Sequence, residues 1–407
     1  MTPGRVDPAG PLDPDGTVVV VGASLGGLRT TQALRRDGFR GRLVLVGAEP
    51  HLPYDRPPLS KQVLSGKWDE DQIALLKPDS LEDLEVDLRL GTAAASLDVE
   101  ARRVELDDGS SIEADAVVVA TGASPRHLFA EQGVRVLRTI EDSLVLRDAV
   151  AAGGRVVVIG AGFIGSEVAA TCVELGCPVI VAESLDVPLA AALGTTIGPA
   201  VAGLHRRHGV DLRTETSVAS VGPGGAGTLS VELTDGGRVE AAAVVAGIGV
   251  VPEVGWLADS SLELADGVVC DGTLFAADGV VAVGDVARWP YRGESVRIEH
   301  WQMAADMGEA AATSLLAGRR EAPRFDPVPY FWSDQYGMKF QVLGRPGPED
   351  EVVVVDGALE DRFVALYRHG QELRAVAALS RPRQLMSYRP LLAARASFDE
   401  ALSAARR

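Results

Sequence analysis

The first apolar stretch of the chain runs into a glycine-rich segment and predicts a strand that leads into a helix. Thr17–Val21 is a run of five β-branched residues, followed directly by Gly22-Ala23-Ser24-Leu25-Gly26-Gly27. Helix-like sequence then continues to Gly38, and a second apolar run covers Arg42–Val46. This order predicts a β–turn–α–β unit whose two strands are parallel.

A second segment repeats this layout. Arg155–Ile159 ends in Gly160-Ala161-Gly162-Phe163-Ile164-Gly165. A helical pattern then runs to Leu175, where Gly176 is placed to end the helix, and a strand is expected at Pro178–Ala182. We therefore expect a parallel sheet around each glycine-rich turn.

The strands that follow each unit also repeat. Val104–Pro125 aligns without gaps onto Val231–Pro252, with an offset of 127 residues and 12 identical positions out of 22. Each copy has a strand, a turn at Asp-Gly, a second strand and an apolar run into glycine. Two related nucleotide-binding folds in one chain explain this duplication.

The order of the segments indicates that the first fold is interrupted by the second and resumes near Asp271. We expect an α/β protein with two Rossmann-like dinucleotide-binding domains, residues 17–142 with 271–322 and residues 143–270. Residues 323–407 predict a third, α+β domain, with strands at Lys339–Leu343, Val352–Val355, Phe363–Tyr367 and Leu373–Ala378 and helix from Pro382. Residues 1–16 are rich in Pro, Gly and Asp, lack the order of a signal peptide, and predict a disordered leader.

The glycine-rich turns are suited to bind the pyrophosphate of a dinucleotide at a helix N-terminus. An acid follows each turn at the end of the next strand: Glu49 lies 22 residues beyond Gly27, and Glu183 lies 18 beyond Gly165. Such a carboxylate accepts hydrogen bonds from ribose hydroxyls and repels a 2′-phosphate. Ser24 stands where the first turn would have its middle glycine, which weakens that fingerprint without removing it.

The residues after Glu183 are Ser184, Leu185 and Asp186, so no adjacent Arg or Lys is available to bind a 2′-phosphate. This favours NADH over NADPH. The alternative, two helix-packing turns in a nucleotide-free fold, stays open at this point.

The charge balance argues against several partners. The 407 residues include 39 Lys+Arg and 57 Asp+Glu, a formal net charge of −18, which disfavours nucleic acid and anionic membranes. No apolar run reaches the roughly 18 residues of a membrane span. Three cysteines make no disulfide framework and indicate a reducing compartment, the cytoplasm.

Several further motifs carry a family resemblance. They are residues 52–61 (LPYDRPPLSK), 120–122 (ATG), 137–142 (LRTIED), 283–285 (VGD), 297–299 (RIE) and 331–337 (FWSDQYG). With the two glycine-rich turns, they resemble the FAD-dependent, NADH-using ferredoxin reductases of bacterial cytochrome P450 and ring-hydroxylating dioxygenase systems. The resemblance runs from about Thr17 to Arg395 and implies a glutathione-reductase-like fold with FAD in the first dinucleotide domain and NAD in the second.

The resemblance also implies which residues bind FAD. They are Gly22, Ser24, Gly26, Gly27, Glu49, Arg56, Lys61, Ala94, Ala120, Thr121, Gly122, Arg138, Asp285, Trp301 and Trp332. Asp285 would bond a ribityl hydroxyl, and Trp301, at the start of a helix, would offer its backbone N–H to the flavin. Other interpretations stay open: Arg56, Arg138 and Arg297 as surface arginines, Asp285 as a turn cap and Trp332 as packing.

The second turn would take NADH. The residues implied there are Gly160, Gly162, Phe163, Ile164, Gly165, Glu183 and Gly249. Glu167, in the helix after the turn, resembles the family glutamate beside the flavin–nicotinamide contact, and we expect it to pair with Lys61. These two are the candidate catalytic residues.

The cysteines exclude a thiol relay. No cysteine precedes Cys172, and Gly176 is expected to end the helix between Cys172 and Cys177. Cys172 is interpreted as a small buried hydrophobe, and Cys270 stands alone. Electrons must therefore leave the flavin directly for an external acceptor, and no cysteine cluster for an iron–sulfur centre or other metal is expected in the chain.

The acceptor that the resemblance implies is a [2Fe–2S] ferredoxin that serves a cytochrome P450 or a Rieske-type oxygenase, bound transiently by a monomer or weak dimer. The alternatives are a rubredoxin as acceptor, or a redox-sensing FAD/NAD interaction protein of the apoptosis-inducing-factor type. An arginine excess follows residue 367, with Glu372 as its one acid as far as 395: Arg368, Arg374, Arg381, Arg383, Arg389 and Arg395. These arginines are a candidate docking surface for an acidic ferredoxin, with unrelated solvated arginines as the alternative.

Overall fold

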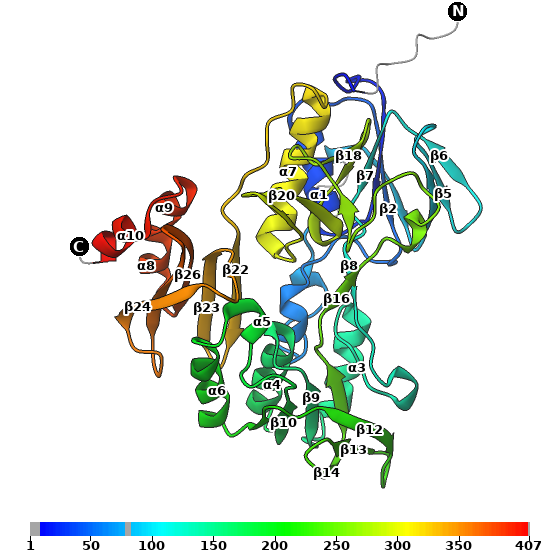
Figure 1. Cartoon of the computed structure of the whole chain (residues 1–407). Helices are drawn as coiled ribbons and strands as arrows, with labels where there is room; N and C mark the ends of the chain where they lie inside the picture. The colour runs from blue at the N-terminus through cyan, green and yellow to red at the C-terminus, as the bar shows by residue number, and fades with distance from the viewer. Residues whose placement is uncertain (1–8, 78–82, 406–407) are drawn as a thin grey trace, which may run out of the picture. The chain divides into compact units, whose positions relative to one another are not determined.

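The computed structural model describes residues 9–77 and 83–405 (Figure 1). Contacts divide the chain into two compact units. The first contains the chain up to Asp55, Ala74–Ser124 and Val251–Pro327. The second contains Arg56–Ile73, Pro125–Val250 and the chain from Val328. The expected domain limits, drawn by dinucleotide role, do not coincide with these units and stay a prediction.

The first unit is built on a six-stranded sheet with strand order β18-β19-β7-β1-β2-β3. These strands are β1 Thr17–Val21, β2 Arg42–Gly47, β3 Val86–Leu90, β7 Ala116–Val119, β18 Phe275–Ala277 and β19 Val280–Ala282. All neighbours pair in parallel except β18, which is antiparallel to β19. Valine side chains of β1 and β7 are fully buried, which explains their unbroken apolar sequence.

Two helices of this unit lie side by side, α1 (Leu25–Arg36) and α7 (Trp301–Ala317), seen in blue and yellow in Figure 1. Their backbones approach closely at Gly308, where an added Cβ would lie 2.6 Å from the Gly26 carbonyl oxygen.

Two small sheets complete the unit. They are β4 (Ala94–Asp98), β5 (Arg103–Leu106) and β6 (Ser111–Glu113), and β17 (Val268–Val269), β20 (Ala287–Tyr291) and β21 (Glu294–Val296).

The predicted interruption of the first fold is confirmed. β19 lies more than 150 residues after β7 in the chain, yet it pairs with β7 in parallel from Val280 to Ala282. A strand from beyond the second glycine-rich turn therefore extends the sheet that begins at Thr17.

The second unit contains the other parallel sheet, with strand order β11-β10-β9-β15. These strands are β9 Val156–Ile159, β10 Val179–Ala182, β11 Asp211–Arg213 and β15 Ala243–Ala246. The α-helices between Pro125 and Val250 are α3 Ile140–Val150, α4 Phe163–Glu174, α5 Ala190–Leu193 and α6 Gly198–Arg207. An antiparallel sheet of β12 (Val218–Pro223), β13 (Leu229–Leu233) and β14 (Arg238–Ala241) joins them.

The internal repeat corresponds to structure, strand by strand. β7 and β8 (Ala123–Pro125), shifted by the 127-residue offset, fall on β15 and β16 (Val250–Pro252) with the same bounds. β6 falls within β14, and β5 within β13. The duplication read from the sequence is therefore a duplication of the fold.

The C-terminal segment forms a five-stranded antiparallel sheet with strand order β22-β23-β26-β25-β24. The strands are β22 Tyr330–Gln335, β23 Met338–Gly344, β24 Glu351–Gly357, β25 Phe363–His369 and β26 Glu372–Leu379, and α8 Pro382–Ser387, α9 Arg389–Ala393 and α10 Phe398–Ala405 follow. The four expected strands and the helix start at Pro382 are confirmed. β22 was not expected, because its sequence YFWSDQ mixes polar and aromatic residues without a long apolar run.

The disordered leader predicted for residues 1–16 is wrong for residues 9–16. Leu12 is buried, and its N–H donates to the Leu315 carbonyl oxygen at 3.0 Å. The Gly41 N–H donates to the Pro14 carbonyl oxygen at 2.8 Å. Proline and glycine form turns here that pack on the first sheet, and residues 1–8 lie outside the described part of the chain.

None of the helices in the described ranges has the length and apolar character needed to cross a membrane.

Candidate functional site

The first glycine-rich turn is held in a conformation that other residues could not adopt. Gly22 has a φ of +119°, and a Cβ there would lie 2.1 Å from the Ala120 carbonyl oxygen. A Cβ at Gly27 would lie 2.0 Å from the Gly22 carbonyl oxygen. The turn is therefore tight because β1, β7 and α1 meet there, as the fingerprint requires.

The second turn has the same geometry. Gly160 has a φ of +91°, and a Cβ at Gly165 would lie 2.1 Å from the Gly160 carbonyl oxygen. At Gly162 the nearest atom to an added Cβ is 3.6 Å away, so this position has room for a small side chain. Ser24, the equivalent residue of the first turn, has a φ of −109° and needs no left-handed backbone.

The helices that follow the two turns leave their N-termini open to a ligand. Neither α1 nor α4 has a side-chain cap or an acid in its first turn, and α7 also has neither. By contrast, α3 has a complete capping box formed by Thr139 and Asp142. The first N–H groups of a helix have no partner within the helix, and the positive potential there suits a phosphate or another electron-rich group.

The two candidate ribose-binding acids differ in their surroundings. Glu49, just after β2, is half-buried and accepts a hydrogen bond from Tyr54 Oη at 2.5 Å. Glu183, just after β10, is buried and accepts the N–H groups of Ala161 at 2.6 Å and Leu185 at 2.9 Å. The Glu183 carboxylate is therefore fixed against its own glycine-rich turn.

Lys61 and Glu167 form the expected ion pair. Lys61 Nζ lies 2.6 Å from Glu167 Oε2, and both side chains are largely buried. Ser60 Oγ donates to the same carboxylate oxygen at 2.5 Å, and Ser333 Oγ donates to Glu167 Oε1 at 2.7 Å. Gln335 Nε2 in turn donates to Ser333 Oγ at 3.2 Å. The pair is thus the centre of a buried polar network drawn from η1 (Pro57–Ser60), α4 and β22.

Sequence reasoning did not single out Ser60, Ser333 or Gln335. Both serines lie inside the family motifs, Ser60 directly before Lys61 and Ser333 directly after Trp332. The sequence does not show that these serines are buried. A polar side chain that is only 1–2% exposed is expected to have a hydrogen-bond partner, so their burial would have identified them.

In the first unit, Trp301 begins α7, as expected, and its Nε1 donates to Asp55 Oδ1 at 2.6 Å. Asp285 lies in η5 (Gly284–Val286), just beyond β19, and is half-buried. The Arg297 side chain is only 9% exposed and donates to Glu299, Asp266 and the Asp285 carbonyl oxygen, so the surface interpretation of Arg297 is wrong.

The remaining candidates of the first unit lie near the carboxyl ends of strands or in small sheets. Thr121 Oγ1 donates to the Glu253 carbonyl oxygen at 2.7 Å, and Gly122 has a φ of +71°. Ala120 directly follows β7, and Ala94 begins β4.

In the second unit, Arg56 Nη1 donates to the Arg138 carbonyl oxygen at 2.6 Å. Phe163 packs edge-to-face on Phe331 with ring centroids 4.6 Å apart, whereas Ile164 is 46% exposed. Gly249 has a φ of +93° with open space around it. Trp332, on the edge strand β22, is half-buried and stacks on Tyr330.

All three cysteines are free and buried. Burial raises the pKa of both Cys172 and Cys270 to about 12, and Cys172 packs in an apolar core with Cys177. Gly176, with a φ of +81°, ends α4 between them as expected. Thiols with such pKa values are poor nucleophiles, so a thiol relay has no residue to carry it.

The arginine excess after residue 367 is smaller in three dimensions than in the sequence. Arg368 lies 3.5 Å from Glu351, and Arg374 lies 3.5 Å from Asp350. Arg381 lies 3.3 Å from Asp356. The count of acids from residue 368 to 395 did not include these three, because they precede that range, on or beside β24.

Family models account for almost all of the chain. One described as "Pyridine nucleotide-disulphide oxidoreductase" matches residues 16–308, and one described as "Reductase C-terminal" matches residues 330–406. The chain belongs to the pyridine nucleotide-disulphide oxidoreductase family. As a member of this family it is an oxidoreductase with FAD and NAD(H) as its cofactors.

Comparison with individual proteins shows which members of this family the chain is similar to. Rhodocoxin reductase of Rhodococcus erythropolis is 35% identical over 387 residues, which cover 93% of this chain and 89% of the relative. The ferredoxin reductase component of the chlorobenzene dioxygenase of Cupriavidus sp. (strain PS12) is 36% identical and covers 94% of each chain. This oxidoreductase is thus similar over more than 90% of its length to other reductases, one of which is the component of a dioxygenase.

A solved structure of a reductase has the same fold as this chain. The reductase in the covalent putidaredoxin reductase–putidaredoxin complex superposes with a TM-score of 0.88, at 32% identity and with 93% of each chain covered. The expected glutathione-reductase-like fold, with a C-terminal reductase domain, is confirmed.

Proposed function

We propose that this oxidoreductase passes electrons from NADH through FAD to a [2Fe–2S] ferredoxin that serves a cytochrome P450 or a Rieske-type oxygenase. The observation that carries the proposal is the presence of two dinucleotide turns in a chain whose thiols are all buried. Such a chain can bind both cofactors but has no accessible thiol through which electrons could leave. The relatives named above supply the class of acceptor.

The residues present fit the two dinucleotides. In the first unit, Gly22, Gly26 and Gly27 with Ser24 bring backbone N–H groups to the start of α1, where the FAD pyrophosphate would lie, and Glu49 would bind its ribose. In the second unit, Gly160, Gly162 and Gly165 would do the same for NADH at the start of α4. The remaining FAD contacts proposed here are Arg56, Lys61, Ala94, Ala120, Thr121, Gly122, Arg138, Asp285, Trp301 and Trp332, and the remaining NADH contacts are Phe163, Ile164, Glu183 and Gly249.

The bound flavin supplies the chemistry, since it takes two electrons as a hydride and returns them singly. The chain's own task is to bind, orient and exclude water. The N-terminus of α7, free of acids in its first turn, would favour the negative charge that reduction brings. Lys61 and Glu167 would act as one unit, because each side chain fixes the position of the other and together they bury no net charge.

The preference for NADH is proposed from Glu183. Two backbone N–H groups hold its carboxylate just after β10, which supports a role in binding a ribose hydroxyl and repelling a 2′-phosphate. No Lys or Arg occurs among the next three residues. We place the protein in the cytoplasm, where NADH is available and its thiols stay reduced.

A stopped-flow experiment tests the proposal. The purified protein should be yellow, should lose flavin absorbance at about 450 nm faster with NADH than with NADPH, and should then reduce a [2Fe–2S] ferredoxin encoded in the same genome. A protein that neither contains flavin nor takes it up would contradict the assignment outright.

The same experiment separates the alternatives. Faster electron transfer to a rubredoxin than to any ferredoxin would favour the rubredoxin reductase. Slow turnover with every acceptor, together with a long-lived complex of reduced flavin and NAD, would favour the redox-sensing interaction protein.

A further inference from the structure

The C-terminal domain reaches the Lys61–Glu167 pair through its edge strand, β22. Side chains alternate along a strand, so Phe331, Ser333 and Gln335 share one face. Phe331 packs edge-to-face on Phe163 at the start of α4, and Ser333 bonds Glu167 one turn further along that helix. At the hairpin tip, Tyr336 Oη lies 2.7 Å from His205 Nδ1. β22 is therefore fixed to its neighbours along its length and cannot shift without breaking these contacts.

Ser333 donates to Oε1, the oxygen of the Glu167 carboxylate to which Lys61 does not donate. Oε2 already accepts from Lys61 and Ser60, whereas Ser333 is the one donor to Oε1 among the described residues. Glu167 is 4% exposed, so water has little access to replace a lost donor. A buried carboxylate oxygen without a donor is costly, and the group would rotate to recover one.

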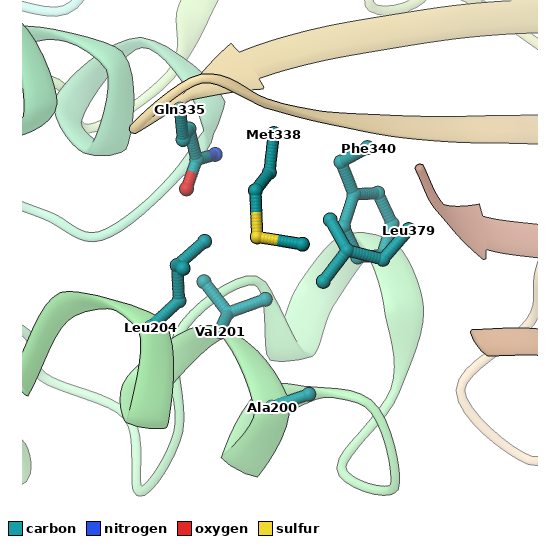
Figure 2. Close-up of a pocket in the computed structure, with 7 residues that line it drawn as sticks. All are labelled: Ala200, Val201, Leu204, Gln335, Met338, Phe340 and Leu379. Carbon is teal, nitrogen blue, oxygen red and sulfur yellow. The ribbon is translucent and has the colours of Figure 1, made fainter. Parts of the chain in front are cut away.

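The direction of the Ser333 hydroxyl is itself determined. Gln335 Nε2 donates to Ser333 Oγ, which leaves the Ser333 hydrogen free to point at Glu167. Gln335 is 4% exposed, and Figure 2 shows its amide beside Leu204 and Met338, in an apolar pocket between α6 and the C-terminal sheet. Gln335 and Ser333 thus donate in one direction, from the C-terminal sheet toward the Glu167 carboxylate. That carboxylate accepts from Lys61 on its other oxygen.

We propose that Ser333 is a positioning residue, whose hydroxyl holds the Glu167 carboxylate in the orientation in which it binds Lys61. The C-terminal domain then contributes a group to the hydride-transfer site, in addition to any part it plays in partner binding. This inference rests on the role proposed above for Lys61 and Glu167.

The test compares variants that differ only in the hydroxyl. Ser333→Val removes the hydroxyl and Ser333→Thr keeps it at nearly the same volume, and both are β-branched residues suited to a strand. We expect Ser333→Val to lower the rate constant of flavin reduction at saturating NADH about tenfold, with the NADH dissociation constant changed by less than about twofold. Ser333→Thr should recover most of the rate, and Ser333→Ala serves if the larger side chains do not fit.

Tyr367→Phe is the matched control. Tyr367 is fully buried in the same C-terminal sheet, and its hydroxyl donates to the Leu193 carbonyl oxygen at 2.9 Å, outside the network of Glu167. This variant also loses one buried hydrogen bond and should lower the unfolding free energy, but it should leave flavin reduction unchanged. Slowing of flavin reduction by Tyr367→Phe to the same extent would mean that loss of stability alone explains the Ser333 result.

A double-mutant cycle with Glu167→Gln adds a readout that does not depend on turnover. If Ser333 acts through Glu167, the losses of unfolding free energy for Ser333→Ala and Glu167→Gln should be non-additive, and the double variant should reduce flavin no more slowly than Glu167→Gln alone. Additive losses in both measurements would overturn the inference. Unchanged flavin reduction in Glu167→Gln would instead overturn the proposed role of Glu167, while the stability cycle would still report whether Ser333 holds this carboxylate.

Discussion

At the scale of single residues, the glycine-rich turns contain positions that need glycine for packing and positions that have room for a small side chain. A Cβ at Gly165 would collide with backbone, but one at Gly162 would have ordinary contacts. Ser24 already occupies the equivalent position in the first turn with an unstrained backbone. The serine is therefore compatible with a dinucleotide turn.

A pair of substitutions checks this distinction. Gly162→Ser should keep the NADH dissociation constant within about threefold of the native value, because the site has room and needs no positive φ. Gly165→Ala should destabilise the protein by about 2 kcal/mol or more and weaken NADH binding, because the Gly160 carbonyl cannot move away without disturbing β9. The measurements are NADH titration and denaturant unfolding. Equal effects of the two variants would contradict the argument.

At the scale of elements, α6 and the β22–β23 hairpin meet at a buried histidine. His205 is fully buried, and its ring contacts Tyr336 Oη and Ser166 Oγ, while His208 stacks on the Tyr336 ring at 4.1 Å. Burial, with a smaller contribution from the charge of His208, lowers the pKa of His205 to about 4. The hairpin is thus anchored by an imidazole that must stay neutral.

The buried, neutral His205 predicts that the free energy of unfolding falls at acid pH. In the unfolded chain His205 binds a proton near its ordinary pKa of 6.5, but in the folded protein only near pH 4, so the unfolded state binds more protons between these values. Stability should therefore fall as the pH drops from 6.5 to 4, by about 3 kcal/mol from this residue alone. Unfolding curves of the native protein and His205→Gln measure the effect, and the variant should show a correspondingly smaller pH slope.

The contact between α1 and α7 makes a second prediction at this scale. Gly308→Ala would place a Cβ 2.6 Å from the Gly26 carbonyl oxygen and 2.8 Å from Arg29 Cβ, which should lower the unfolding free energy by about 2 kcal/mol. Gly203→Ala in α6 is the matched control, since its Cβ would meet only the flexible end of Arg207 at 3.1 Å. That change should be neutral or stabilising by up to about 1 kcal/mol through helix propensity. Similar losses in both variants would show that close packing at Gly308 is not the cause.

At the scale of the whole molecule, a net charge of −18 must still allow an acidic partner to dock. The structure reduces the candidate surface, because Arg368, Arg374 and Arg381 have acidic partners within the C-terminal domain. Arg383, exposed on α8, and Arg389, at the start of α9, have no ion pair among the described residues. Of the six arginines of the candidate surface, we therefore choose these two to test the docking proposal.

Charge reversal checks the docking proposal. The double variant Arg383→Glu with Arg389→Glu should slow ferredoxin reduction about tenfold at low salt, with a smaller effect at 0.5 M salt, because exposed charges mainly steer encounter. Dye reduction by NADH should not change. The single variant Arg368→Glu, at an arginine that already has a partner, should have a weaker effect. An unchanged ferredoxin rate in the double variant would reject this surface.

Much of the molecule was predictable from local pattern. The strands around the turns, the end of α4 at Gly176 and the duplication at an offset of 127 residues were all found, because β-branched runs and glycines act over a few residues. The partners of Glu167 were found only in part. Lys61 came from a family motif, whereas Ser333 could not be paired with Glu167 by any rule of spacing, since 166 residues separate them.

The sequence by itself determined that two dinucleotide-binding folds are present and that the cysteines do not form a redox pair, since glycine spacing and residue counts need no tertiary contact. The tertiary structure alone decided that Ser60 and Ser333 join Lys61 in satisfying Glu167, which arginines of the candidate surface have acidic partners, and that residues 9–16 pack on the first sheet. The physical reason is that hydrogen-bond satisfaction and charge neutralisation depend on distance in space, which a chain folded into sheets separates from distance in sequence.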